Sequence, residues 1–297
     1  MNAAIVVHGG AGASGQHQDG CVKAAQAGEV LLRGGAGALE AAVAAVVMLE
    51  DDGRFNAGSG SRLKLDGVTI EMDASVMDCG GRLGAVAGLQ KTRNPVLVAR
   101  AVADTPHHLL CGEGALRLAR HLGYPAHYQV SPQQRNQYRE MIDKLRQGGA
   151  ALPGVASADF IDYWNYVSPA ALRMPDACDT VGAVVRDDQG RFAVAASTGG
   201  AAPSLLGRVG DTPIVGSGYY AGPHGAVAAT GIGEHIMRHM LAREVYQWLA
   251  DGMPLQDALQ RAVDMFDPAV DLGIIAVSAT EAGSGSNREM PSCALGA

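Results

Sequence analysis

Four short segments in the second half of the chain combine hydroxyl, guanidinium and carboxylate groups with glycine. They read Asp179-Thr-Val-Gly182, Ser197-Thr-Gly-Gly200, Gly207-Arg-Val-Gly-Asp211 and Thr230-Gly-Ile-Gly-Glu234. A threonine hydroxyl is a poor nucleophile at neutral pH, but a free α-amino group on the same residue, with an unperturbed pKa near ~8, can take its proton. A guanidinium can grip a carboxylate through two parallel hydrogen bonds, and a carboxylate can hold an ammonium group. These residue types therefore suit nucleophilic attack on a substrate that carries both charges.

Each segment also has a plain structural interpretation. Thr180 begins a hairpin, where threonine is common, and Thr198 can cap a turn. Thr230 can cap the start of a helix. Arg208 and Asp211 are spaced i, i+3 in a glycine loop, where they could form a surface ion pair worth under ~1 kcal/mol. The chemistry depends on the whole set of segments and not on any one of them.

Other signature patterns are incomplete. The run from Gly10 to Gly15 fits the dinucleotide-binding pattern G-x-G-x-x-G, but no second strand ending in an acidic residue follows about 20 residues later, so a structural glycine turn is favoured. The nine histidines show no metal-ligand spacing, and there is no G-x-S-x-G elbow. The five cysteines are scattered and lack a C-x-x-C pair, which favours neither a disulfide framework nor a zinc site.

The elements that must position the four segments are short strands and amphipathic helices. We expect strands at 3–7, 62–65, 68–72, 84–89, 180–186, 191–198 and 273–279, and helices at 21–33, 38–50, 95–103, 233–251 and 254–266. Strands at both ends of the chain with helix pairs between them favour a layered α+β sandwich over a strictly alternating doubly wound sheet.

The segment 131–179 differs from the rest of the chain in composition. It is rich in Gln, Arg, Ser, Pro and Tyr and shows weak periodicity, which predicts an exposed, mobile connection. The hairpin that begins at Thr180 follows directly.

The bulk composition excludes several classes of protein. A chain of 297 residues with 47% hydrophobic residues can bury a substantial core. A net charge of -7 without a basic run disfavours a nucleic-acid partner. The N-terminus lacks the pattern of a signal peptide and no apolar run approaches the length of a membrane span, so we expect a cytoplasmic protein that acts on a small molecule.

Three further motifs in the first half complete a family pattern. They are Val7-His-Gly-Gly-Ala-Gly12, Phe55-Asn-Ala-Gly58 and Met72-Asp-Ala-Ser-Val-Met-Asp78. With the four segments above, the chain resembles the plant-type (type III) L-asparaginases and isoaspartyl peptidases, together with the glycosylasparaginases and threonine aspartase, from residue 4 to about 280. The resemblance implies one catalytic domain, 1–297, with the four-layer αββα sandwich of N-terminal-nucleophile hydrolases.

The resemblance also implies that the precursor cuts itself between Asp179 and Thr180. The Thr180 hydroxyl would attack the Asp179 carbonyl, and water would hydrolyse the resulting ester. The products would be an α-subunit of residues 1–179, including the linker 131–179, and a β-subunit of residues 180–297. Two such pairs would form a dimer of αβ heterodimers.

The remaining roles follow from the same resemblance. Thr180 would attack a β-aspartyl amide bond and form a β-aspartyl-threonyl ester, while Thr198 orients the nucleophile. The Thr230 hydroxyl and the Gly231 N–H would stabilise the oxyanion, and losing one such donor typically costs on the order of 10² to 10³ in rate. The substrate-binding residues would be Asn56, Arg208, Asp211 and Gly233.

No organic cofactor is implied. A structural sodium ion is a further feature that the resemblance suggests, although the residue types do not demand it. Its ligands would be main-chain carbonyls of the loop that contains Leu49, Glu50, Phe55, Ala57 and Ser59.

Departures from the pattern keep two alternatives open. Asparaginases and isoaspartyl peptidases usually have glycine before the nucleophile, whereas this chain has Asp179, as glycosylasparaginases do. One alternative is therefore glycosylasparaginase activity on N4-glycosylated asparagine. An alternative of another class is an uncleaved, catalytically silent relative that serves as a binding protein.

Overall fold

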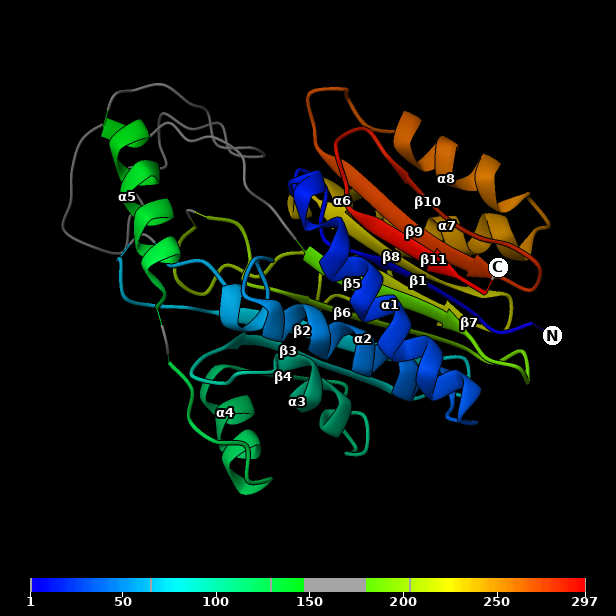
Figure 1. Ribbon diagram of the computed structural model, residues 1–297, viewed down its shortest axis with the longest axis horizontal. Helices are drawn as coiled ribbons and strands as arrows, with labels where there is room; N and C mark the ends of the chain where they lie inside the picture. The colour runs from blue at the N-terminus through cyan, green and yellow to red at the C-terminus, as the bar shows by residue number, and fades with distance from the viewer. Residues whose placement is uncertain (1, 65, 129, 147–179, 203, 297) are drawn as a thin grey trace.

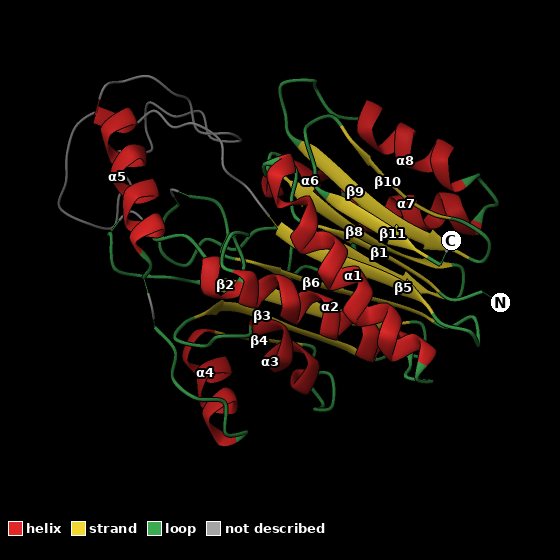
Figure 2. Cartoon of the chain, in the orientation of Figure 1, coloured by secondary structure: helices red, strands yellow, loops and turns green. Residues whose placement is uncertain are grey.

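The computed structural model describes residues 2–64, 66–128, 130–146, 180–202 and 204–296. Strands and helices make a mixed α+β fold (Figures 1 and 2). The strands are β1 (Ala4–His8), β2 (Met72–Asp78), β3 (Leu83–Leu89), β4 (Leu109–Cys111), β5 (Thr180–Arg186), β6 (Phe192–Thr198), β7 (Tyr219–Gly222), β8 (Gly225–Gly231), β9 (Leu272–Ser278), β10 (Ala282–Ser286) and β11 (Ser292–Leu295). The α-helices are α1 (Gln18–Arg33), α2 (Ala38–Asp52), α3 (Pro95–Val102), α4 (Gly112–His121), α5 (Pro132–Arg146), α6 (Gly233–His239), α7 (Leu241–Ala250) and α8 (Leu255–Asp264).

The larger sheet interleaves strands from distant parts of the chain. Its seven strands run in the order β11-β1-β5-β6-β2-β3-β4. Strand β5 is central and pairs antiparallel with β1 on one side and with β6 on the other (Figure 1). A strand that begins at Thr180 is therefore held by hydrogen bonds along both edges.

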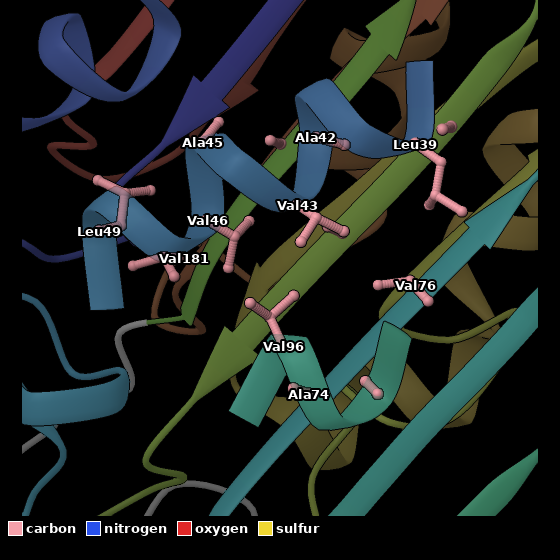
Figure 3. Packing of buried hydrophobic residues seen from close by; sticks show 14 of the residues in the cluster. Leu39, Ala42, Val43, Ala45, Val46, Leu49, Ala74, Val76, Val96 and Val181 are labelled. Carbon is pink, nitrogen blue, oxygen red and sulfur yellow. The ribbon is translucent and has the colours of Figure 1, made fainter. Parts of the chain in front are cut away.

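Alternate residues of β5 face two different surroundings. Val181, Ala183 and Val185 belong to a buried cluster with helices α1, α2 and α3, part of which Figure 3 shows around Val181. Val184, from the other set, packs with residues of the smaller sheet. Because side chains alternate along a strand, Thr180 points to the same side as Val184.

The smaller sheet has four strands in the order β10-β9-β8-β7. One of its faces supplies Tyr219, Ala228 and Ile275 to the cluster shared with the larger sheet. The other face carries Val227 and Ile274, which pack against helices α7 and α8. The two sheets are thus joined by apolar side chains, and each has helices on its other side (Figure 2).

Most of the expected elements are confirmed. These include the strands at β1, β3 and β9, the hairpin β5–β6, and the helices α1, α2, α3 and α8. The strands expected at 62–65 and 68–72 are wrong, because the described residues there form turns and extended loop before β2 begins at Met72. The helix expected at 233–251 is split into α6 and α7 by Met240, whose φ of 46° interrupts the helical path.

The first part of the expected connection is helical. Helix α5 occupies 132–146, and Gln134 at its start is buried and donates hydrogen bonds to the carbonyls of Ser59 (3.1 Å) and Ser61 (2.7 Å). Residues 147–179, and with them Cys178 and Asp179, lie outside the described part of the chain. Among the described helices, none combines the length and the apolar character needed to cross a membrane.

Candidate active site

Thr180 lies where the two sheets face each other, at the start of β5. Its side chain is buried, and the residue is in register with Thr198 on β6. The Thr180 N–H donates to the hydroxyl of Thr230 on β8 at 3.3 Å. The Thr180 hydroxyl lies 3.5 Å from that of Thr212, a weak contact between two groups that can each donate or accept. Hydroxyl groups from three separate segments thus surround the first residue of β5.

The end of β8 places the Thr230 hydroxyl next to Thr180, and Gly231 follows Thr230 directly. The Thr230 hydroxyl also accepts the Ala11 N–H at 3.3 Å, so it links β5 to the loop that follows β1. Gly231 has a φ of 135°, and a Cβ there would overlap the carbonyl oxygen of Asp271. Only glycine fits this conformation and this close approach.

Thr198 and Asn56 hold the loop after β6. The Thr198 hydroxyl accepts the Gly200 N–H at 3.0 Å. The side-chain amide of Asn56 donates to the Gly200 carbonyl at 2.8 Å. The main-chain carbonyl of Asn56 accepts the Gly199 N–H, also at 2.8 Å. Asn56 is buried and therefore tethers the segment beside the threonines.

Arg208 is held by an acidic partner from the start of α6. Its Nε and Nη2 donate to the two carboxylate oxygens of Glu234 at 2.9 and 2.8 Å. Nη2 would also lie 3.0 Å from a Cβ placed on Gly233, so this glycine leaves room for the guanidinium. The bidentate geometry fixes the plane of the Arg208 side chain.

Asp211 is a buried carboxylate with an unused oxygen. Its Oδ2 has no hydrogen-bond partner among the described residues, and its Oδ1 would lie 2.8 Å from a Cβ on Gly233. Burial raises the pKa of Asp211 to about 7, although the nearby Arg208 charge opposes this rise. A buried carboxylate without partners is costly, and a ligand ammonium group would satisfy it.

Two charged residues at the site were not predicted from the sequence. Lys64 is buried and donates to the Gly199 carbonyl and the Ser204 hydroxyl, each at 3.2 Å. Asp73 is also buried. Burial raises its pKa, and the Gly88 N–H bond and the Lys64 charge oppose the rise. The only signal for Lys64 was a lysine within an expected strand, whereas Asp73 was part of the quoted Met72–Asp78 motif.

Thr212 and His8 were likewise given no role from the sequence. Thr212 follows Asp211 directly and its carbonyl accepts the Ser75 hydroxyl at 2.7 Å, so it ties the acidic residue to β2. His8 is fully buried opposite Gly182, and burial lowers its pKa to about 3 while the Thr180 backbone opposes this change. His8 is therefore neutral throughout the physiological pH range.

The loop after α2 gathers main-chain oxygens. A Cβ on Gly58 would lie 2.7 Å from the Glu50 carbonyl oxygen, and one on Gly60 would lie 2.8 Å from that of Gly53 and overlap that of Phe55. The Ser59 hydroxyl already donates to the Glu50 carbonyl at 2.6 Å. Carbonyl oxygens suit a hard cation such as Na⁺. Within the described ranges no group of three or more His, Cys, Asp and Glu side chains could hold a metal.

The structure thus brings together residues from all four glycine-rich segments. Thr180, Thr198 and Thr230 converge at the ends of their strands, and Arg208 and Asp211 meet at Gly233. The two groups are contiguous, because Thr212 touches Thr180 and adjoins Asp211. A hydroxyl with hydrogen-bond donors beside it and with separate positive and negative groups nearby can attack a carbonyl of a zwitterionic ligand.

Comparison with known proteins gives a consistent result. The family described as "Asparaginase" matches residues 1–293. The plant-type L-asparaginase of Pyrococcus horikoshii is 38% identical over 272 residues, 88% of this chain and 84% of the relative. That of Thermococcus kodakarensis is 38% identical over 291 residues, 93% of this chain and 90% of the relative. The isoaspartyl peptidase/L-asparaginase of Mus musculus is 39% identical over 271 residues, 88% of this chain and 76% of the relative.

Proposed function

Because this chain belongs to the asparaginase family, we propose that it hydrolyses β-aspartyl amide bonds, those of isoaspartyl dipeptides and of L-asparagine, with Thr180 as the nucleophile. The observation that carries the proposal is the position of Thr180. It is a buried threonine at the start of a central strand, with its nitrogen 3.3 Å from the Thr230 hydroxyl. The chain is accordingly an enzyme of the L-asparaginase and isoaspartyl peptidase type, in line with the names of its relatives.

Activation requires one peptide bond to break. The Thr180 hydroxyl attacks the carbonyl carbon of Asp179, the C–N bond breaks, and the acyl group moves from nitrogen to oxygen. Water then hydrolyses this ester and releases a free α-amino group on Thr180. An α-amino group has an unperturbed pKa near ~8 and can serve as the base within the same residue. The products are residues 1–179 and 180–297.

Turnover repeats the attack on the substrate. The free amine takes the proton of the Thr180 hydroxyl, and the oxygen adds to the β-carbonyl carbon of the substrate. Thr230 and the Gly231 N–H stabilise the negative charge that develops on the carbonyl oxygen. The C–N bond then breaks, the leaving nitrogen takes the proton from the Thr180 amine, and water hydrolyses the β-aspartyl-threonyl ester.

The charged pair at Gly233 selects the aspartyl part of the substrate. Arg208 binds the α-carboxylate and Asp211 binds the α-ammonium. The unpartnered Asp211 Oδ2 supports this assignment, because an ammonium group is the partner that a buried carboxylate lacks. Thr198 orients the nucleophile, and Asn56 keeps the adjoining loop in place.

Several features of fold and assembly belong to the same proposal. The two packed sheets with helices on their outer sides support the proposal of a four-layer αββα sandwich of the N-terminal-nucleophile hydrolase type. We expect two cleaved chains to form a dimer of αβ heterodimers. The carbonyl oxygens of Glu50, Gly53 and Phe55 are suited to hold a structural sodium ion.

Mass spectrometry and substrate hydrolysis test the proposal together. After incubation, the purified protein should give two fragments that begin at Met1 and Thr180, and it should hydrolyse β-aspartyl-leucine and L-asparagine. Thr180→Ala should remain full-length and inactive. Full-length protein that hydrolyses these substrates would overturn the mechanism, and a protein that is neither cleaved nor active would instead be a silent binding relative.

Asp179 favours one second candidate, glycosylasparaginase activity. The same hydrolysis assay with N4-glycosylated asparagine as substrate decides between glycosylasparaginase activity and the activity proposed above. A value of kcat/KM for the glycosylated substrate well above that for the dipeptide and for asparagine would assign the chain to this alternative.

A further inference from the structure

The position of the Thr180 nitrogen defines the side on which the leaving group departs. In the proposed reaction, on which this inference rests, the leaving nitrogen takes its proton from the Thr180 amine. That nitrogen lies against the Thr230 hydroxyl, which the Ala11 N–H also reaches, each at 3.3 Å. The loop that contains Ala11 and Gly12 therefore borders the side of Thr180 on which the nitrogen lies.

Gly231 at the end of β8 and Gly233 at the start of α6 separate this side from the aspartyl-binding side. A Cβ on Gly233 would face Asp211 and Arg208, whereas a Cβ on Gly231 would face the main chain of Asp271. Asp271 also approaches the loop after β1, since its Oδ2 lies 3.7 Å from the position of a Cβ on Gly12. Asp271 thus borders both Gly231, the proposed oxyanion donor, and the loop that contains Gly12.

Asp271 forms an ion pair with Arg288 through Arg288 Nε and Asp271 Oδ1. The Asp271 side chain is 14% exposed and that of Arg288 is 40% exposed, so the carboxylate is the inner partner and the guanidinium the outer one. The guanidinium also donates a long hydrogen bond from Nη1 to the Asn287 carbonyl at 3.3 Å. A guanidinium has five N–H donors, so this one can also bind an external carboxylate.

Asn287 fixes the ion pair to the end of β9. Its side chain accepts the Leu272 N–H at 2.9 Å and donates to the Val270 carbonyl at 2.8 Å, and its own N–H donates to the Leu272 carbonyl at 3.1 Å. These bonds clamp the main chain on both sides of Asp271. A fixed Asp271 keeps the guanidinium that it binds in place, and a binding group needs such support from its neighbours.

We propose that Arg288, oriented by Asp271, binds the free α-carboxylate of the amino acid that leaves, so that the enzyme prefers β-aspartyl dipeptides to L-asparagine. In a β-aspartyl dipeptide this carboxylate lies two bonds from the scissile nitrogen, on the side where the ion pair stands. Asparagine releases ammonia, which has no group for Arg288 to bind.

Three substrates and four variants test this proposal. The substrates are β-aspartyl-leucine, its C-terminal amide and L-asparagine. The variants are Arg288→Gln, Arg288→Lys, Asp271→Asn and, as a matched control, Arg33→Gln, which breaks an exposed ion pair with Glu29 on helix α1. Each variant is first checked for cleavage before Thr180, so that a failure to mature is not taken for a loss of recognition.

The expected result is selective. Arg288→Gln should lower kcat/KM for β-aspartyl-leucine by about tenfold to a hundredfold, the range for losing a hydrogen bond to a charged group. The same variant should change the values for the amide and for asparagine by less than about twofold, since neither engages the lost charge. Arg288→Lys should retain part of the preference, Asp271→Asn should lose part of it, and Arg33→Gln should match the wild type.

Two other outcomes have different meanings. An equal loss on all three substrates, or no loss on the dipeptide, would overturn the role of Arg288 and leave the proposed function intact. A wild-type protein that is cleaved but hydrolyses none of the three substrates would instead refute the proposed function.

Discussion

The guanidinium of Arg208 makes two hydrogen bonds to the carboxylate of Glu234, at 2.9 and 2.8 Å. Glu234 begins helix α6 and Arg208 lies in the loop before Asp211, so the pair joins two segments of the site. In the proposed function Arg208 binds the substrate carboxylate, and Glu234 keeps the guanidinium in place for this. Glu234 is therefore a positioning residue for substrate recognition.

Glu234→Gln should raise KM for L-asparagine by about tenfold or more, because a neutral amide holds the guanidinium less firmly than a carboxylate does. Steady-state kinetics of the cleaved protein measures this, and kcat should change less than KM. Glu113→Gln, which alters an exposed ion pair on helix α4, is the control. An unchanged or lower KM would mean that Glu234 competes with the substrate for Arg208.

Asp211 should make substrate capture depend on pH. Burial raises its pKa to about 7, and only the ionised carboxylate attracts an ammonium group. The value of kcat/KM should therefore rise as the pH increases to about 7, below the separate rise that deprotonation of the Thr180 amine causes near ~8. In Asp211→Asn the rise of kcat/KM toward pH 7 should disappear, and kcat/KM should fall below the wild-type value mainly above about pH 7, where the wild-type carboxylate is ionised. If kcat/KM of this variant still rises toward pH 7, a group other than Asp211 titrates there.

Gly231→Ala should prevent both maturation and activity. The new methyl group would overlap the Asp271 carbonyl oxygen at a φ of 135°, so the end of β8 would have to move. The expected cost in the free energy of unfolding is about 1 to 3 kcal/mol or more. Gly114→Ala is the matched control, because a Cβ at this exposed helical position meets nothing within 4 Å, and it should stabilise by about 0.5 to 1 kcal/mol. Urea unfolding and the fraction of cleaved chain report both effects.

Glu50→Gln should stabilise the protein at alkaline pH. Burial raises the pKa of Glu50 to about 8, while the hydrogen bond that the Val96 N–H donates to Glu50 at 3.0 Å opposes the rise. A raised pKa means that the folded state binds the extra proton, so this contribution is complete below about 4.5 and is lost as the pH rises to about 8. Glutamine keeps an acceptor for the Val96 N–H without having to ionise.

The comparison is best made in the Thr180→Ala background, where the chain should stay in one piece. Between pH 5 and pH 9, the free energy of unfolding of Glu50→Gln should increase relative to its parent by about 1 kcal/mol or more. Glu113→Gln, at an exposed position, should show no such trend. A constant difference between Glu50→Gln and its parent would show that Glu50 does not titrate in this range.

The sequence predicts the elements that have strong local signals. The β5–β6 hairpin is an example, because two runs of small and branched residues flank a four-residue turn. Strand β10, Ala-Gly-Ser-Gly-Ser, has little intrinsic strand propensity and forms because β9 offers it a partner. The break at Met240 lacks the glycine that usually marks such a site, so periodicity extended one helix across it.

At the candidate site, too, some residues have a local sequence signal and others are placed only by tertiary contacts. Arg208, Asp211 and Thr230 stood in glycine-rich segments whose residue types suggested chemistry, and the fold brings them together. Lys64 could not be found in this way, since its burial depends on Gly199 and Ser204, more than 130 residues away. Contacts set by tertiary structure leave little trace in the local pattern.

The interleaving of β1, β5, β6 and β2 determines what cleavage before Thr180 can do to the molecule. Strand β5 pairs with β1, and β6 pairs with β2, so strands from both sides of the break alternate within one sheet. The larger sheet would contain strands of both fragments, and neither fragment could keep that sheet complete by itself, whereas the four strands of the smaller sheet all belong to residues 180–297. We therefore expect the cut chains to melt in one transition, and separately expressed halves to aggregate through their unpaired edges unless they meet while folding.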